Sequence, residues 1–222
     1  MKKCLFAVLG ILLLPLSGIA TAQQSSVPAS FAYNVKMGTG SGPSVTLALS
    51  VAVQSTASDG SRQAEVTVHI PWMRPLDGKR MNATLSPFGA IQIASTGDIN
   101  KSYSQMQVAA ESQAASGPMV QNFISPLDTF ADALAAAPSQ KAGTSWHAAA
   151  MQFVDVVYTI TAHQQQNGRD TLSVTWASQG TGPAINGQGN YDPVAHLVVS
   201  LHSELRQAAG GQAAVTDIAM AP

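Results

Sequence analysis

Charged side chains are scarce in this chain, and this scarcity limits what it can bind. Only 10% of its 222 residues are Asp, Glu, Lys or Arg, against about 25% in an average domain. The formal net charge is −1, so bulk electrostatics attracts neither nucleic acid nor an anionic membrane surface. The apolar fraction of 45% is too high for a disordered chain. We therefore expect a folded protein without a nucleic-acid partner.

Cysteine and the short catalytic motifs are also missing. Cys4 is the only cysteine, so the rest of the chain has neither a disulfide nor a thiolate nucleophile. No Gly-x-Ser-x-Gly or His-Glu-x-x-His motif occurs, and the glycine-rich stretches 38–43 and 180–189 lack the Gly-Lys-Ser/Thr ending of a phosphate loop. We interpret both stretches as hairpin loops. The sequence favours a non-enzymatic protein without cofactors or catalytic residues, and its scattered carboxylates leave a hydrolase open as an alternative.

The chain has no apolar run long enough to cross a bilayer. The run Leu5–Leu14 has about half of the ~20 residues that a membrane helix needs. Lys2 and Lys3 precede it, and Ala20-Thr21-Ala22 supplies the small-x-small pattern that signal peptidase accepts. We predict that residues 1–22 are a cleaved signal peptide, that no transmembrane segment follows, and that the mature protein is periplasmic or secreted. Nine basic residues then face 12 acidic ones, so the mature net charge is −3.

Apolar and polar residues alternate over most of the remaining chain, with the period of two that is typical of strands. Asp59-Gly60 and Asn167-Gly168 supply the turn chemistry of hairpins. Such regular alternation predicts a sheet that is covered on one face only. The expected strands cover 31–37, 45–54, 63–72, 90–95, the stretch opened by Trp146, 154–163, 172–176 and 197–205, with 73–89 irregular.

Helical periodicity occurs only in the middle of the chain. Residues 100–116 carry a thin apolar stripe, so they fit either a helix or a loop. A clearer helix begins at Ser125, which can cap it, with Pro126 in the first position. Its apolar face has the i, i+3, i+4, i+7 spacing, and Pro138 ends it. The residues of this face are Leu127, Phe130, Ala131 and Leu134.

The two strand-rich parts have similar orders of elements, which suggests two duplicated half-sheets joined side by side. Their apolar faces need a cover, and the helical segment between them is the candidate. We predict an α+β, mainly β fold, in which a curved antiparallel sheet (a half-barrel) has one or two helices covering one face. The predicted divisions are a flexible lead 23–30, a single β-rich domain 31–210 with halves 31–97 and 144–206 around the helical segment 100–137, and a tail or edge strand 211–222.

Two short segments suggest a family. Tyr191-Asp192-Pro193 precedes His196-Leu197-Val198-Val199-Ser200, and Ser86-Pro87-Phe88-Gly89-Ala90-Ile91 occupies the matching place in the first half. With a signal peptide and a helical insert between half-sheets, this pattern resembles the half-barrel envelope proteins of the lipoprotein-carrier type. The resemblance implies an apolar ligand held between the sheet and the helices.

Histidine and carboxylate side chains on the last predicted strand raise the question of a metal site. His196 and His202 would lie about 20 Å apart on one strand face, at ~3.3 Å per residue, which is too far for one ion. His202 and Glu204 could share an ion with a third ligand from another strand. The same residues also fit a solvated polar face, and we predict no metal site.

Apolar residues of the predicted inner face are candidates for a ligand site. We predict an exported envelope protein that binds an apolar small molecule or a lipid between the concave face of the sheet and the 120–137 helix. An envelope protein is the alternative partner, and a structural or interaction module would have the same residues fully packed. The methionines Met81, Met106, Met119 and Met151 would suit such a pocket or fill gaps in a core. The predicted ligand-binding residues are Phe123, Leu127, Phe130, Trp146, Tyr158 and Trp176.

Overall fold

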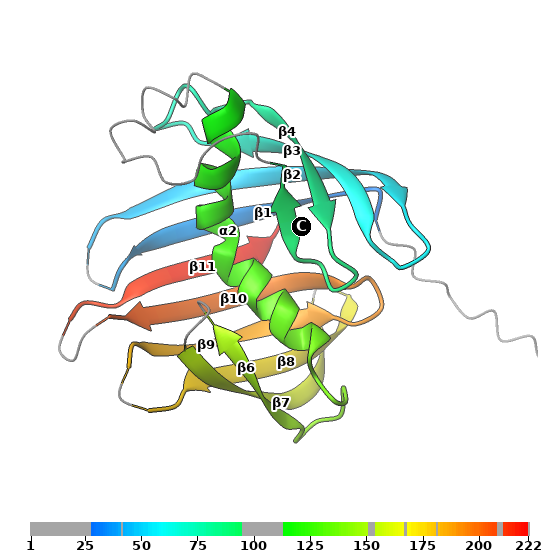
Figure 1. Cartoon of the computed structure of the whole chain (residues 1–222), viewed down its shortest axis with the longest axis vertical. Helices are drawn as coiled ribbons and strands as arrows, with labels where there is room; N and C mark the ends of the chain where they lie inside the picture. Colours follow the sequence, from blue (N-terminus) through cyan, green and yellow to red (C-terminus); the bar gives the residue numbers. More distant parts are fainter. Residues whose placement is uncertain are drawn as a thin grey trace, which may run out of the picture.

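Eleven antiparallel strands in one sheet and one helix packed against it make up the described part of the chain (Figure 1). The predicted fold class is therefore confirmed.

The computed structural model describes residues 28–40, 42–94, 113–150, 154–166, 168–180, 182–207 and 211–221. The predicted signal peptide, most of the predicted lead, most of the 100–116 segment, Met106 and Met151 lie outside the described residues. The elements are β1 (Ser30–Thr39), β2 (Ser44–Thr56), β3 (Arg62–His69), β4 (Arg80–Leu85), β5 (Ile91–Ile93), α2 (Gln113–Ala135), β6 (Ser145–Ala150), β7 (Val154–Gln166), β8 (Arg169–Ser178), β9 (Ala184–Asp192), β10 (Leu197–Arg206) and β11 (Ala214–Met220).

The sheet consists of two meanders that meet where β1 pairs with β11. The strand order is β5-β4-β3-β2-β1-β11-β10-β9-β8-β7-β6, and the central pairing runs from Tyr33 opposite Met220 to Thr39 opposite Ala214. Two half-sheets lie side by side, as their similar orders of elements predicted. β5 and β6 are the edges of the sheet, and α2 lies between them in the chain and across the strands in space (Figure 1).

The C-terminal strand occupies the middle of the sheet. We predicted a tail or an edge strand for residues 211–222, and this prediction was wrong, because β11 lies between β1 and β10 and pairs with both. Alanine occupies two of its seven positions, so its apolar alternation is weak. Pairing with two neighbours, more than the local pattern, makes this segment a strand.

Two strands were missed because glycine and proline surround or fill them. β4 lies in the 73–89 stretch that we expected to be irregular, between Gly78 and Pro87. β9 covers much of the 180–189 stretch that we interpreted as a loop. The third predicted strand was too long, because β3 ends at His69, and Trp72, which we expected inside, is 45% exposed in the following turn.

The helix α2 begins earlier than predicted and runs through both of its prolines. We predicted a start at Ser125-Pro126, but α2 begins at Gln113 and includes Pro118 and Pro126. A proline lacks the N–H that would bond the carbonyl four residues earlier, which for Pro126 is the carbonyl of Asn122. The Ser125 hydroxyl donates to that carbonyl oxygen at 3.1 Å, so the acceptor is satisfied and the helix continues. Figure 1 shows that α2 changes direction between its two halves, as proline-containing helices do.

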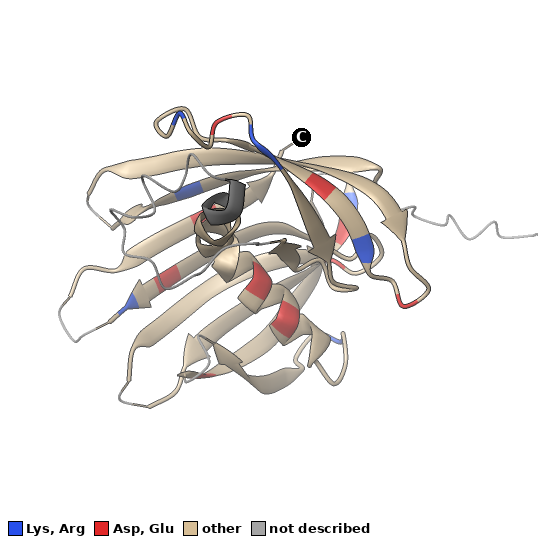
Figure 2. Ribbon diagram, turned by 45° about the horizontal axis from the view of Figure 1, so that its top comes forward, with Lys and Arg blue, Asp and Glu red and all other residues tan. Residues whose placement is uncertain are grey.

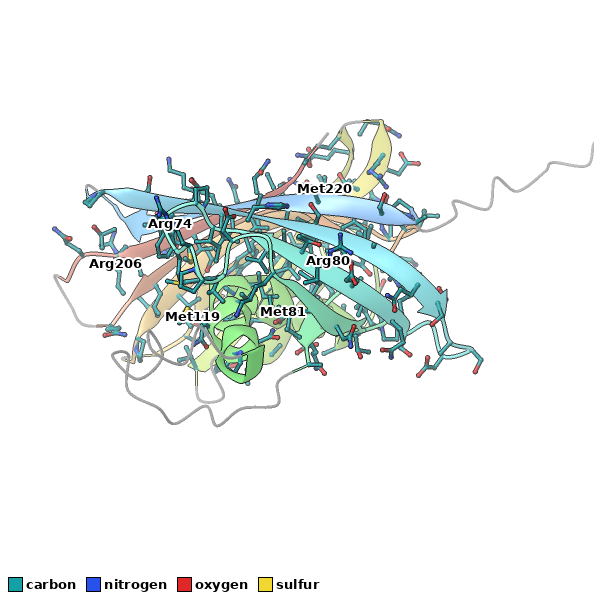
Figure 3. All side chains as sticks on the ribbon, turned by 90° about the horizontal axis from the view of Figure 1, so that it is seen from above. Arg74, Arg80, Met81, Met119, Arg206 and Met220 are labelled. Atoms are coloured by element: carbon teal, nitrogen blue, oxygen red, sulfur yellow. The ribbon has the colours of Figure 1, made fainter. Side chains whose placement is uncertain are left out.

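The core lies between α2 and the concave face of the sheet, which curves around the helix (Figure 2). Buried residues alternate along the strands, as Tyr33 and Val35 do on β1. Met81 and Met119 lie between the strands and the helix (Figure 3), and both are buried. No helix in the described part of the chain is both long and apolar enough to cross a membrane. All four residues of the predicted helix face are buried, namely Leu127, Phe130, Ala131 and Leu134.

Candidate functional site

A pocket opens between α2 and the strands of the second meander. Its volume is about 180 Å³, and we call it the α2 pocket. A cavity of about 150 Å³ holds a benzene-sized molecule, whereas drug-sized ligands need roughly 300–1,000 Å³. The α2 pocket therefore has room for part of one slim hydrocarbon chain or for a single ring. It is lined by Asn122, Ser125, Pro126, Thr129 and Phe130 of α2, Ala150 of β6, Tyr158 of β7, Trp176 of β8, Ile185 of β9, Ser203 and Leu205 of β10, and Ala214 and Thr216 of β11.

One row of paired residues across the sheet explains why this pocket exists. The row is Trp146 (β6), Tyr158 (β7), Trp176 (β8), Gly187 (β9), Ser203 (β10) and Thr216 (β11). Large aromatic side chains fill the space on the first three strands. Gly187 follows on β9, where the Trp176 indole covers its backbone. Ser203 and Thr216 follow on β10 and β11, and their small side chains leave the space beneath α2 open. The pocket results from this step in side-chain size.

Gly187 and Gly189 of β9 make room for the aromatic rings beside the pocket. A Cβ on Gly187 would overlap the indole ring of Trp176 and the carbonyl oxygen of His202. A Cβ on Gly189 would lie 2.9 Å from the ring of Phe130. Both rings therefore lie directly on the β9 backbone, which only a strand with glycine at these positions allows.

Four aromatic rings form a continuous series from α2 to the edge of the sheet. The ring centroids are 5.0 Å apart for Phe130 and Trp176, 5.8 Å for Trp176 and Tyr158, and 5.6 Å for Tyr158 and Trp146. The Nε1–H of Trp146 donates to the carbonyl oxygen of Ala133 at 2.9 Å. This hydrogen bond fixes the C-terminal part of α2 to the edge strand β6. The aromatic wall of the pocket is thus held by both the helix and the sheet.

Uncharged polar groups complete the lining. Ser203 and Thr216 are paired neighbours on β10 and β11, and Thr129 contributes from α2. Within the described part of the chain, neither these three hydroxyls nor that of Tyr158 makes a hydrogen bond. Burial raises the pKa of Tyr158 to about 12, so its hydroxyl stays a neutral donor at physiological pH. The α2 pocket combines an aromatic wall with free, uncharged hydrogen-bonding groups.

The structure brings together half of the predicted ligand-binding set. Three of the six residues line the α2 pocket, namely Phe130, Tyr158 and Trp176. Trp146 lies behind Tyr158 in the aromatic series and does not line the pocket. Leu127 is fully buried in the core. Phe123 packs edge-to-face on Trp72, with ring centroids 6.2 Å apart, and also lies outside the lining. That any of these residues binds a ligand stays a prediction.

The sequence analysis did not identify most of the strand residues that line the pocket. Ser203 has the same parity as Leu201 and Leu205 on the last predicted strand, so the alternation itself marks it as inward-facing. Ile185 was hidden in the glycine-rich stretch, and Thr216 lay in the predicted tail. For Thr216 the useful signal is pairing with a distant strand, which local pattern does not contain.

Two side chains of α2 fasten the helix to the other edge of the sheet. The Gln121 amide accepts from the N–H of Ile93 at 2.8 Å and donates to the carbonyl of Ile91 at 2.9 Å. Asp128 accepts from the N–H of Ile91 at 2.7 Å and from the Gln121 amide. These bonds satisfy outward backbone groups of β5 that would otherwise be open to pairing. With Trp146 at β6, they hold α2 at both edges of the sheet.

The pKa of Asp128, one of these two side chains, lies well above its ordinary value. Burial raises its pKa from 3.8 to about 7, against the hydrogen bond from Ile91, and the nearby charge of Asp132 adds to the rise. The charges on α2 are acidic only (Figure 2). β5 contributes no charged side chain, and the titratable neighbour on β1 is Tyr33. The protonation of Asp128 is therefore coupled to the contact between α2 and β5.

A polar cluster fills the end of the concave face opposite the α2 pocket. We call it the Arg62 cluster, formed by Tyr33, Arg62, Tyr191, Asp192 and His196. Arg62 is 2% exposed, and its Nη2 donates to the carbonyl oxygen of His196 at 3.1 Å, while Nη1 has no partner among the described residues. Burial lowers the pKa of Arg62 and raises that of Tyr33. These large buried side chains close that end of the interior.

The two segments that suggested a family meet at this cluster. Phe88 and His196 are in edge-to-face contact, with ring centroids 6.2 Å apart. Gly89 has a φ of 91°, and a Cβ there would lie 2.7 Å from the carbonyl oxygen of His196, so only glycine fits. The Asp192 carboxylate accepts from the N–H groups of Val194 and Ala195 at 2.9 and 2.8 Å, which shapes the turn before β10.

The outer face of the sheet places His202 between two carboxylates. Its Nδ1 lies 2.6 Å from Asp217 and its Nε2 lies 3.4 Å from Glu204, and the hydrogen bond to Asp217 raises the pKa of His202. No group of three or more His, Cys, Asp or Glu residues in the described ranges is arranged to hold a metal ion. Because both ring nitrogens face carboxylates, neither is left to activate a serine such as Ser200.

Comparisons with known proteins add a distant likeness of shape. No protein-family model matches the chain, and none of the curated proteins matches it. Among solved structures it is similar to a "putative exported protein with YmcC-like fold" from Bacteroides fragilis, at 12% identity over 87% of this chain and 95% of that chain, with a TM-score of 0.33. A "putative lipoprotein" from Parabacteroides distasonis is similar at 11% identity over 89% and 98%, also with a TM-score of 0.33. Likeness at this level carries no argument about function, which has to come from the residues of this chain.

Proposed function

We propose that this chain is an exported binding protein that holds the apolar part of a ligand reversibly in the α2 pocket. The proposal is carried by the step in side-chain size across the sheet, which leaves an apolar pocket against Phe130, Tyr158 and Trp176. Export is supported by the signal-peptide pattern of residues 1–22. Burial of apolar surface drives binding, and no covalent step is involved.

The pocket volume predicts how affinity depends on the length of the ligand chain. Each buried methylene contributes about 0.8 kcal/mol, which is roughly a fourfold gain in affinity. A volume of about 180 Å³ admits only part of one chain, and association itself costs several kcal/mol. Affinity should therefore rise with chain length until the pocket is full and then stop rising. Such modest affinity suits a ligand that is taken up and released.

Tryptophan fluorescence offers a direct test, because Trp176 lines the pocket and Trp72 lies elsewhere. A brominated acyl monoglyceride quenches an indole that its chain touches. We expect saturable quenching in the intact protein and in the Trp72→Phe variant. The Trp176→Phe variant should lose most of the quenching while it keeps the fold, since phenylalanine still packs against Phe130.

Two outcomes would contradict the proposal. Quenching that never saturates means that the probe partitions onto the surface without a site. Quenching that survives in Trp176→Phe and disappears in Trp72→Phe places the ligand beside Phe123 instead of in the α2 pocket. The first outcome favours the alternative of a structural or interaction module.

A further inference from the structure

The described residues that line the α2 pocket carry no charge. Among the described residues that line it there is no Asp, Glu, Lys, Arg or His. Arg62 is a buried cation, but it lies in the Arg62 cluster at the opposite end of the concave face. There it donates to the carbonyl oxygen of His196. A charged ligand group that entered the pocket would lose its water without gaining an ion-pair partner.

The hydrogen-bonding groups of the pocket lie on two sides of the space. Ser203 and Thr216 are directly paired on adjacent strands, so their hydroxyls lie on the same face of the sheet as neighbours. Thr129 lies on the helix side, and Tyr158 belongs to the aromatic wall. Hydroxyl groups can both donate and accept, so this set suits a ligand group with neutral acceptors and donors.

We propose that the ligand is a single hydrocarbon chain whose adjoining polar group is uncharged, as in an acyl ester or acyl amide. This inference rests on the proposed function, because it names the ligand class of the same pocket. The chain lies against Phe130 and Trp176, and the ester or amide bonds to the hydroxyls of Ser203 and Thr216. Because the described lining residues supply no cation, we expect the ionised form of a free fatty acid to bind more weakly. An ester lipid and an acylated protein share this chemistry.

Binding measurements with probes of equal chain length test this inference. The probes are a monoglyceride, an acylated peptide amide and the corresponding fatty acid, each at pH 8. We expect the neutral probes to bind at least tenfold more tightly than the ionised acid. The affinity of the acid should rise as the pH falls through its own pKa and the acid becomes neutral. A preference between the monoglyceride and the peptide identifies a lipid or an acylated protein as the source.

Variants that remove single hydroxyls separate hydrogen bonding from apolar burial. Thr216→Val and Ser203→Ala keep the strand and the size of the side chain, so we expect several-fold weaker binding of the monoglyceride. Thr175→Val on the outer face is the matched control and should leave binding unchanged.

The outcomes distinguish this inference from the proposed function. Equal or tighter binding of the ionised fatty acid overturns the inference and leaves the proposed function intact, as does unchanged monoglyceride binding in both hydroxyl variants. If none of the probes binds, both the inference and the proposed function are overturned.

Discussion

The two ends of the concave face differ in how far side chains fill the interior space. Near the β2–β3 and β9–β10 turns, Arg62 and Tyr33 fill the space and bond to backbone carbonyls of the other meander. Near the β8–β9 and β10–β11 turns, Ser203 and Thr216 leave it open. One curved sheet can therefore have a packed end and an accessible end. The size of the side chains at a few paired positions determines whether an end is filled or open. We expect changes at the packed end to alter stability and changes at the open end to alter binding.

Truncation of the packed end should have the largest effect on stability. Arg62 is the largest fully buried side chain in the described part of the chain. Arg62→Ala removes its bond to His196 and leaves a cavity, so we expect the free energy of unfolding in urea to fall by about 3 kcal/mol. The control is Arg80→Ala on the adjacent strand, whose side chain is 73% exposed beside Glu65, and which should cost less than about 0.5 kcal/mol. Equal losses in the two variants would contradict a closed end held by Arg62.

The attachment of α2 to β5 should make stability depend on pH. The unfolded chain ionises Asp128 near 3.8, but the folded chain keeps its proton up to a pKa of about 7. Between these values the folded state binds the extra proton, so this contribution to stability falls as the pH rises, by at most about 1.4 kcal/mol per pH unit. Asp128→Asn should flatten the profile between pH 5 and pH 7, as chemical denaturation at each pH will show. An unchanged slope would contradict a buried, protonated carboxyl at this contact.

His202 on the outer face should give a smaller effect in the same direction. Its folded pKa is raised by Asp217, so the stabilisation is present below its ordinary value and is lost as the pH rises through the folded pKa. Because the side chain is 38% exposed, solvent weakens the effect. His202→Gln should lower stability at pH 6 by less than Asp128→Asn changes it, and Asp217→Asn should reproduce the loss. A loss at pH 9 larger than at pH 6 would contradict this account.

The sequence predicted the sheet well where apolar side chains alternate and poorly where they do not. Period-two patterns identified β1, β2, β7, β8 and β10, because a strand with one buried face needs that pattern. β9 was missed because Gly187 and Gly189 resemble a loop, although they serve the packing of Trp176 and Phe130 from distant parts of the chain. The segment that forms β11 was predicted as a tail or an edge strand, because its central position in the sheet depends on two partners that are far away in sequence.

The candidate site was predicted only in part for the same reason. Phe130, Tyr158 and Trp176 are large and lie on clear periodic faces, so the sequence identified them. The pocket itself is left open by small residues such as Ser203 and Thr216. Their side chains add nothing to the apolar periodicity from which strands and helix faces are predicted. The start of α2 was misplaced because Ser125 and Pro126 form a good helix-start signal, whereas in the structure the serine hydroxyl compensates for the proline within the helix.

Native mass spectrometry of the protein isolated gently from the cells that produce it tests the central claim most directly. Thr216→Phe puts a ring into the α2 pocket, and Thr175→Phe puts the same ring on the outer face. We predict that the intact protein and Thr175→Phe carry a bound mass of one acyl-chain compound, and that Thr216→Phe is bare. Bare spectra for all three proteins, or the same bound mass on Thr216→Phe, would contradict a ligand pocket at the open end of the sheet.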